Sequence, residues 1–289
     1  MSTKRELAPY QLAERSIIKK YRKQIWHPFV MAMDEYDLVH AGDKIAVCVS
    51  GGKDSFLLAK LMQELQRHSR VPFECVFLCM DPGYAEANRR KIEDNAELLN
   101  ISLTIFETNI FDVANQQEKN PCYLCAKMRR GWLYKKAQEL GCNKIALGHH
   151  FDDVIETTLM SMFYSSEVRT MIPKLYSIHY EGMQLIRPMY RIHEADIIAW
   201  SRYNGLEFLQ CACRFTENCA ECDDGIGESK RQEVKALIKQ LKKDNPTIDK
   251  SIFNAVHNVQ LDTMPGYNTL GEDHSFLDRY ELQDPWKNT

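Results

Sequence analysis

Residues 50–55, Ser-Gly-Gly-Lys-Asp-Ser, combine residue types that can hold a phosphate group. They follow a short apolar run and precede an amphipathic stretch, so we expect them to join a strand to a helix. Paired glycines let backbone N–H groups point at one anion, and a helix start adds free N–H donors and partial positive charge. The predicted phosphate-binding residues are Ser50, Gly51, Gly52, Lys53, Asp54 and Ser55.

The spacing of this loop differs from the two best-known nucleotide signatures. It fits neither G-x-x-x-x-G-K-[ST] nor G-x-G-x-x-G, so neither a Walker loop nor a dinucleotide site is indicated. A tight turn between strand and helix, capped by Ser or Asp, is the competing interpretation. The joint presence of two glycines, a lysine and two serines favours the phosphate site.

A second segment with suitable chemistry is residues 146–153, Ala-Leu-Gly-His-His-Phe-Asp-Asp, which we expect to end a strand and open a helix. Gly148 permits close backbone approach to a flat ligand. Asp152 and Asp153 are placed either to bind Mg²⁺ or to cap the helix. His149 and His150 lie between Gly148 and Asp152, and histidines in such a position are more often packed or capping residues than catalysts.

Asp81 ends another expected strand and precedes Pro82-Gly83. A carboxylate at that position can bind the hydroxyl groups of a ribose. It can equally accept hydrogen bonds within its own turn, as Asp commonly does. Both interpretations stay open.

The ten cysteines divide into apolar and clustered groups. Those inside apolar runs, Cys48, Cys75 and Cys79, are expected to behave as small buried hydrophobes. Close pairs in an intracellular enzyme point to metal or redox chemistry before disulfides. The clustered cysteines are Cys122 and Cys125, then Cys211, Cys213, Cys219 and Cys222.

The pair Cys122-x-x-Cys125 fits zinc, an iron–sulfur cluster or a redox dithiol. Zinc usually takes two such pairs, and Cys219-x-x-Cys222 offers a second one. Three thiolates on a [4Fe–4S] cluster instead leave one iron open to an exogenous ligand. The residues alone do not choose between these sites.

Composition indicates a soluble globular protein of the cytoplasm. The chain has 289 residues, 44% of them hydrophobic, and no apolar run near the roughly 20 residues that span a bilayer. Its formal charge of −3 argues against coating nucleic acid through bulk charge. A nucleic-acid substrate would need local basic patches, such as the one within residues 127–136.

Short apolar runs alternate with helical stretches after residue 44, which predicts a doubly wound parallel sheet covered on both faces. An N-terminal helix over residues 9–33, a hairpin over 176–187, a strand at 206–209 and helices at 228–243 and 247–259 complete the expected elements. Beyond residue 265 we expect a loosely ordered polar tail. The predicted domains are residues 1–43, 44–212, 213–265 and 266–289.

The motifs resemble those of a known enzyme superfamily. SGGKDS is similar to the signature of the PP-loop ATP pyrophosphatases, which cleave ATP between the α and β phosphates, and LGHHFDD resembles their second motif. Over residues 44–265 the chain also resembles the tRNA 2-thiocytidine synthetases. The further segments that carry this likeness, in order, are PCYLCAKMRRGWLY, MIPKL, IRPMY, KRQEV and IFNAVHNV.

That resemblance implies an ATP-dependent tRNA thiolase that adenylates the C2 carbonyl of an anticodon-loop cytidine and then transfers sulfur. It implies a [4Fe–4S] cluster held by Cys122, Cys125 and a later cysteine. This chain has Cys211-Ala212-Cys213 where the family has C-x-x-C, so Cys213 is our choice and Cys211 the alternative.

Further expectations follow from the same resemblance. The cofactors are the cluster, ATP and Mg²⁺, and the partners are tRNA, a sulfur donor such as a cysteine desulfurase, and a second copy in a homodimer. The expected catalytic residues are Lys53 on the phosphates, Asp152 for Mg²⁺ or a proton, and Arg129 on the phosphates or the tRNA backbone.

Three other functions compete with this one. A 2-thiouridine thiolase would share every motif. A PP-loop ligase such as a lysidine synthetase would keep SGGKDS but leave the cysteines unexplained. An iron–sulfur or zinc RNA-binding module would keep the cysteines but leave the phosphate loop unexplained.

Overall fold

The computed structural model describes residues 7–111, 121–209 and 226–280. For residues 121–123, 125, 126 and 226–229 it describes the backbone alone. Internal contacts divide the chain into two compact units, Met1–Leu237 and Ile238–Thr289. The finer division expected from the sequence stays a prediction.

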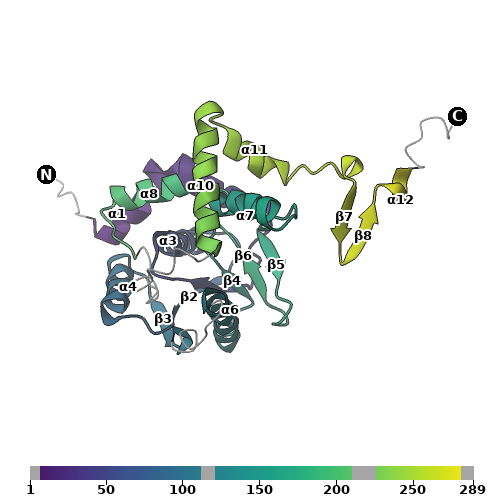
Figure 1. Ribbon diagram of the computed structural model, residues 1–289. Helices are drawn as coiled ribbons and strands as arrows, with labels where there is room; N and C mark the ends of the chain where they lie inside the picture. Colours follow the sequence, from purple (N-terminus) through teal and green to yellow (C-terminus); the bar gives the residue numbers. More distant parts are fainter. Residues whose placement is uncertain (1–6, 112–120, 210–225, 281–289) are drawn as a thin grey trace. The chain divides into compact units, whose positions relative to one another are not determined.

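The first unit is built on a six-stranded sheet with the order β3-β2-β1-β4-β6-β5 (Figure 1). Every neighbouring pair is parallel except β5 with β6. The predicted parallel sheet is therefore confirmed, with one antiparallel edge strand supplied by the predicted hairpin. The strands are β1 (Lys44–Cys48), β2 (Glu74–Asp81), β3 (Leu103–Glu107), β4 (Lys144–Ala146), β5 (Lys174–Tyr176) and β6 (Gln184–Ile186).

Helices cover both faces of this sheet, and the strands are apolar on both sides. Ile45 and Val47 of β1 pack in one core, and the alternating residues Ala46 and Cys48 pack in another. The first core includes α3 (Lys53–His68), α4 (Glu86–Leu98) and α8 (Glu194–Tyr203), and the second includes α6 (Pro121–Glu139). A further helix, α7 (Phe151–Tyr164), follows β4.

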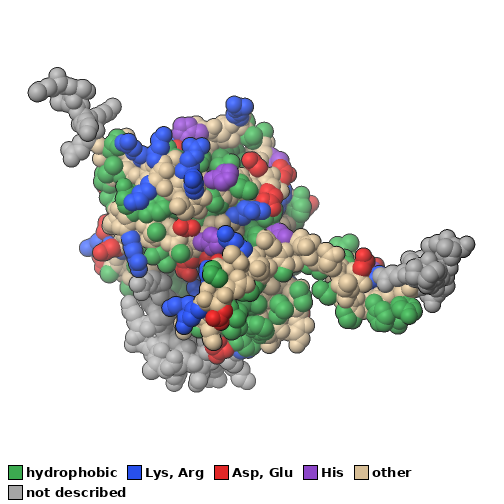
Figure 2. Space-filling model, turned by 90° about the horizontal axis from the view of Figure 1, so that it is seen from above, with side chains coloured by type: hydrophobic (Ala, Val, Ile, Leu, Met, Phe, Trp, Pro, Cys, Tyr) green, Lys and Arg blue, Asp and Glu red, His purple; other side chains and the backbone are tan. Residues whose placement is uncertain are grey.

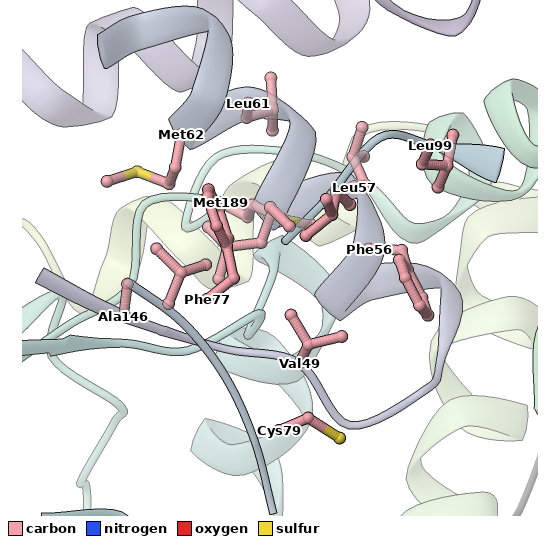
Figure 3. Packing of buried hydrophobic residues seen from close by; sticks show 14 of the residues in the cluster. Val49, Phe56, Leu57, Leu61, Met62, Phe77, Cys79, Leu99, Ala146 and Met189 are labelled. Atoms are coloured by element: carbon pink, nitrogen blue, oxygen red, sulfur yellow. The ribbon is translucent and has the colours of Figure 1, made fainter. Parts of the chain in front are cut away.

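The larger core anchors the turn between β1 and α3. Val49 comes directly before that turn, and Phe56 and Leu57 come after it, and all three are fully buried (Figure 3). Because both ends of the turn are fixed by apolar packing, residues 50–55 are held at the carboxyl edge of the sheet, where α/β proteins bind ligands.

The N-terminal segment forms the predicted helix, although its middle is wound as π-helix. Its parts are α1 (Pro9–Arg15), two π-helical segments (Ser16–Lys20 and Arg22–Trp26) and α2 (His27–Glu35). Glu14 fastens it to α3 by accepting a hydrogen bond of 2.6 Å from the fully buried Lys60.

The C-terminal helices are confirmed as α10 (Ile226–Asp244) and α11 (Ile248–Ala255), followed by a 3₁₀ turn at Leu261–Thr263. The expectation of a loosely ordered tail is wrong for residues 266–280. There β7 (Gly266–Thr269) pairs with β8 (Glu272–Ser275), and α12 (Leu277–Tyr280) follows. Leu270 and Gly271 both have positive φ, which closes a two-residue hairpin turn.

The predicted strand at 206–209 is also wrong, because these residues pair with no sheet strand. Instead the Leu209 N–H donates to the Gly51 carbonyl at 3.3 Å, so this segment lies against the loop between β1 and α3. Within the described residues, no helix is both long and apolar enough to cross a lipid bilayer.

Candidate active site

The loop between β1 and α3 is closed by its own hydrogen bonds. The Ser55 hydroxyl donates to the Gly52 carbonyl at 2.8 Å, and the Ser50 N–H donates to the Ser55 oxygen at 3.1 Å. Gly51 has a φ of +94°, and a Cβ there would lie 2.9 Å from Ile92. Glycine is therefore required at this position both by the turn and by packing.

The second predicted segment meets this loop directly. A Cβ on Gly148, just beyond β4, would lie 3.2 Å from the carbonyl carbon of Asp54 and 3.3 Å from the Ser55 nitrogen. The absence of a side chain thus lets β4 and the first turn of α3 approach closely. The two glycine-bearing motifs, nearly 100 residues apart in sequence, form one site.

Lys53 is held by two carboxylates at the start of α3. Its Nζ lies 2.9 Å from Oε1 of Glu194 and 3.2 Å from Oδ2 of Asp54. Burial lowers the pKa of Lys53, but Asp54 and Glu194 outweigh it and raise that pKa above its usual value. Burial also opposes ionisation of Glu194, yet Lys53 brings the pKa of that carboxyl to about 2. Both groups are charged at neutral pH.

Asp152 and Asp153 shape the start of α7. Oδ2 of Asp153 accepts the His150 N–H at 2.9 Å, which is a helix cap, and its Oδ1 accepts from Arg231 of α10 at 3.1 Å. Oδ2 of Asp152 accepts the Glu194 N–H at 2.7 Å. Both carboxylates therefore act as structural acceptors here, and Asp152 ties α7 to the residue that holds Lys53.

Two further titratable groups lie beside these carboxylates. Glu156 is buried 3.5 Å from Arg231 and 3.6 Å from Lys235, but burial raises its pKa to about 7. His149 is half-buried, and desolvation together with the nearby Arg187 lowers its pKa to about 4, so it is neutral at neutral pH. In the described part of the chain, no group of three or more His, Cys, Asp or Glu is arranged to hold a metal ion.

Asp81 ends β2, and both of its oxygens have partners. Oδ1 accepts the N–H groups of Gly83 at 2.9 Å and Tyr84 at 2.7 Å, and Oδ2 accepts from Arg89 at 2.6 Å. Burial opposes ionisation, but the Tyr84 N–H and Arg89 lower the pKa of Asp81. Asp81 is thus a turn residue here, and a role in ribose binding stays a prediction.

Arg129 reaches the phosphate loop through one tyrosine. Its Nη2 donates to the Tyr84 hydroxyl at 3.3 Å, and that hydroxyl lies 3.5 Å from the Ser50 carbonyl oxygen. Burial raises the pKa of Tyr84 to about 12, so its hydroxyl stays protonated. The helix that begins with Cys122 and Cys125 is therefore linked to the loop between β1 and α3.

The cysteine predictions lie largely outside the described residues. The backbone of α6 places Cys122 and Cys125 three residues apart in its first turn, on one helix face, and their side chains are not described. Cys211, Cys213, Cys219 and Cys222 lie outside the described ranges. Of the remaining cysteines, Cys48, Cys75 and Cys79 are free thiols whose pKa burial raises to about 12, as expected for inert apolar residues.

Sequence reasoning missed four residues of the site: Tyr84, Glu194, Arg231 and Lys235. Glu194 begins α8, and Arg231 and Lys235 belong to α10, so these three residues lie far in sequence from both glycine motifs of the site. A signal for Glu194 was its place at an expected helix start after a strand. No local sequence pattern indicated that Arg231 or Lys235 belongs to the site.

Residues 19–213 match the PP-loop domain family. The chain is 35% identical over 232 residues to a tRNA-cytidine(32) 2-sulfurtransferase of Citrifermentans bemidjiense, covering 79% of this chain and 87% of that protein. It is 33% identical over 249 residues to the protein of the same name from Coxiella burnetii, covering 84% and 92%.

Among solved structures, the fold is similar to that of the U34-tRNA thiolase NcsA from Methanococcus maripaludis with its [4Fe-4S] cluster. The TM-score is 0.62 at 21% identity, covering 81% of this chain and 79% of that one. At this identity the likeness concerns the fold.

Proposed function

Because the chain belongs to the PP-loop domain family and to the tRNA-cytidine(32) 2-sulfurtransferases, we propose that it replaces the C2 oxygen of a tRNA cytidine with sulfur, using ATP. The observation that carries this proposal is the contact from Arg129 through Tyr84 to Ser50. It joins a helix that starts with a C-x-x-C pair to a phosphate-binding loop. A PP-loop ligase would use only the loop, and an RNA-binding metal module would use only the cysteines. A 2-thiouridine thiolase would use both and differ only in the base that it modifies.

The first step is adenylation of the base. The C2 carbonyl oxygen attacks the α-phosphorus of ATP, and pyrophosphate leaves. The backbone N–H groups at the start of α3 and the ammonium of Lys53 stabilise the charge on the phosphates. When ATP binds, Lys53 exchanges its ion pair with Glu194 for one with a phosphate oxygen. Arg129 extends from α6 toward the same loop and adds a second cation near the phosphates.

In the second step a sulfur nucleophile adds to C2, and AMP leaves with the original oxygen. The donor set at the start of α6 suits an iron–sulfur cluster, because the sequence places two cysteines three residues apart there. Cys122, Cys125 and Cys213, with Cys211 as the alternative third ligand, would hold a [4Fe–4S] cluster, which supplies an iron site open to exogenous sulfur.

Mg²⁺ would accompany ATP, and it usually keeps several waters while taking one or two carboxylates. Asp152 remains our candidate ligand, although one of its oxygens accepts the Glu194 N–H. Asp54 is a second candidate, since its Oδ1 is buried and makes no hydrogen bond within the described residues.

We also propose a sulfur donor such as a cysteine desulfurase and a homodimer as partners. tRNA binding through local patches suits the charge distribution: on the face in Figure 2, Lys and Arg side chains form separate groups among acidic and apolar ones. The chain is 35% identical to a cytidine sulfurtransferase and 21% identical to the U34-tRNA thiolase, which favours cytidine over uridine as the target base.

The experiment is an anaerobic reaction of the purified protein with ATP, Mg²⁺, sulfide and a tRNA transcript that carries cytidine at position 32. We expect 2-thiocytidine in the digested nucleosides, with AMP and pyrophosphate formed in step. A matched transcript with uridine at that position should stay unmodified. Formation of 2-thiouridine instead would favour the uridine thiolase, and ATP cleavage that no tRNA stimulates would refute both.

A further inference from the structure

A shallow cavity with no lining residue from the phosphate loop lies between α6 and Tyr180. Tyr180 belongs to residues 177–183, which join β5 to β6 (Figure 1). The volume of the cavity is about 290 Å³, near the lower limit for small-molecule sites. Four α6 residues at helical spacing supply one wall, and Tyr180 supplies the other. The lining residues are Met128, Gly131, Trp132, Lys135 and Tyr180.

The Tyr180 wall is fixed in place. Its hydroxyl donates to the Gly131 carbonyl at 2.9 Å. Its ring stacks on the buried Tyr134, with ring centres 5.0 Å apart and planes inclined by 9°. Since two independent contacts hold the side chain, this wall of the cavity is preformed.

Gly131 keeps the cavity open. It lies inside a 19-residue helix, where glycine is less stable than alanine. A Cβ there would lie 3.5 Å from the Tyr180 hydroxyl oxygen, an ordinary contact, so the surrounding packing does not require glycine. The backbone conformation does not require glycine either, because the residue is helical. The missing side chain instead leaves room for something that enters the cavity.

The open side carries an aromatic face with a cation beside it. Trp132 is 38% exposed, and the Lys135 Nζ lies 5.2 Å from the centre of its ring. Aromatic faces stack on unpaired nucleobases, and an adjacent cation binds a phosphate of the same strand. An apolar peptide would gain nothing from the Lys135 cation.

We propose that this cavity binds an unpaired base of the substrate tRNA, stacked on Trp132 with a neighbouring phosphate at Lys135. The inference rests on the proposed function, because it takes tRNA as the substrate. Trp132 lies seven residues beyond Cys125, which is two helical turns, about 10 Å along α6 and on nearly the same face. An RNA strand with its target base at the start of α6 therefore passes the cavity.

The test measures the Kd of a fluorescently labelled tRNA transcript by anisotropy for Trp132→Ala and Gly131→Leu. We expect the Kd to rise roughly 5- to 100-fold in each, as for the loss of one base–aromatic stack. The KM for ATP should stay unchanged. Trp132→Phe should restore most of the affinity, and Gly131→Ala, which adds only one methyl group at the cavity, should weaken binding less than Gly131→Leu.

Lys135→Ala has a matched control on the next residue. Lys136 pairs with Glu139 at 3.1 Å and does not line the cavity, so Lys136→Ala should leave tRNA binding unchanged. Thermal unfolding of each variant checks that the helix is intact. The expected pattern is weaker tRNA binding by Lys135→Ala together with Trp132→Ala and Gly131→Leu.

Two outcomes separate the base site from the proposed function. If the wild type binds and thiolates tRNA while Trp132→Ala and Gly131→Leu keep its Kd, the base site is wrong and the proposed function stands. If those variants bind tRNA normally but no longer respond to a sulfur-donor protein, the cavity is a protein-docking site and our inference also fails. A wild type that binds no tRNA would overturn both.

Discussion

The Nζ of Lys53 lies 2.9 Å from Oε1 of Glu194, so the cation of the phosphate loop is held by a carboxylate from a helix that begins 141 residues later. Glu194 is itself fixed by Lys235 at 3.4 Å and through its N–H by Asp152 at 2.7 Å. The position of Lys53 therefore depends on α7, α8 and α10 as well as on its own loop.

Lys53→Ala should lower pyrophosphate release roughly 100- to 1,000-fold, the usual loss when one charge-stabilising donor is removed from an active site. The side chain is 27% exposed and belongs to the first residue of α3, so the free energy of unfolding should change by no more than about 1 kcal/mol. Pyrophosphate assay and urea unfolding measure the two effects. Lys91→Ala, at an exposed ion pair on α4, is the control and should retain activity. Normal turnover by Lys53→Ala would refute the assignment of the loop.

Glu194→Gln should separate ATP binding from turnover. Neutralising Glu194 removes the competitor of the phosphates for Lys53, and a partly exposed ion pair is worth about 1 kcal/mol, so the KM for ATP should fall roughly fivefold. The kcat should also fall, because Lys53 loses the partner that aims it. Steady-state kinetics give both values. Lys235→Met removes a second cation from both Glu194 and Glu156, so the Glu194 carboxylate holds Lys53 more strongly and the KM for ATP should not fall. An unchanged KM in Glu194→Gln would contradict the competition.

The local chemistry of residues 50–55 and 148–153 made both segments predictable, because each carries its glycines, cation or carboxylates within a few positions of a strand end. Glu194, Arg231 and Lys235 were not predictable, since only the folded chain brings α8 and α10 to that edge. Residues 206–209 are mostly apolar, as a strand would be, yet the Leu209 N–H bonds the Gly51 carbonyl and no strand, which sequence periodicity does not reveal. The hairpin within residues 266–280 was not predicted, because this segment is largely polar. Its one local signal was Gly271, which lies in the turn.

Glu156 predicts a pH dependence of stability. Its pKa is about 7 in the folded protein, against a usual 4.5, so the folded chain retains this proton where the unfolded chain has lost it. The stability that Glu156 contributes is fully present below pH 4.5 and is lost as the pH rises through 7. Near pH 8 the buried carboxylate should cost on the order of 2 kcal/mol, with solvent screening taken into account.

Glu156→Gln isolates this effect from the other titrating groups. His149, with its pKa lowered to about 4, acts in the opposite direction below pH 6.5 and is common to both proteins. We expect the variant and the wild type to differ little in free energy of unfolding at pH 4.5, and the variant to be the more stable at pH 8. Urea titrations at several pH values measure the difference. A difference that does not change with pH would show that Glu156 titrates normally.

The cysteines give the sharpest test of the proposed cluster. Purified without oxygen, the protein should be brown and hold about four irons per chain, the content of one [4Fe–4S] cluster. Cys213→Ala should lose both the iron and tRNA thiolation, while Cys211→Ala should keep a cluster with reduced activity. Cys142→Ala, at a free buried thiol remote in sequence from both cysteine clusters, is the control and should keep its iron.

The two single variants also decide how many thiolates bind the cluster. If Cys211→Ala alone loses iron, the third ligand is Cys211 and not Cys213. If both variants lose iron, four thiolates hold the cluster, no iron is open to exogenous sulfur, and delivery of sulfur at the cluster must be abandoned. Full zinc occupancy without iron would replace the cluster with a structural metal site. In that case Lys53→Ala should still lower pyrophosphate release to the same extent, because the phosphate loop and the metal site use different residues.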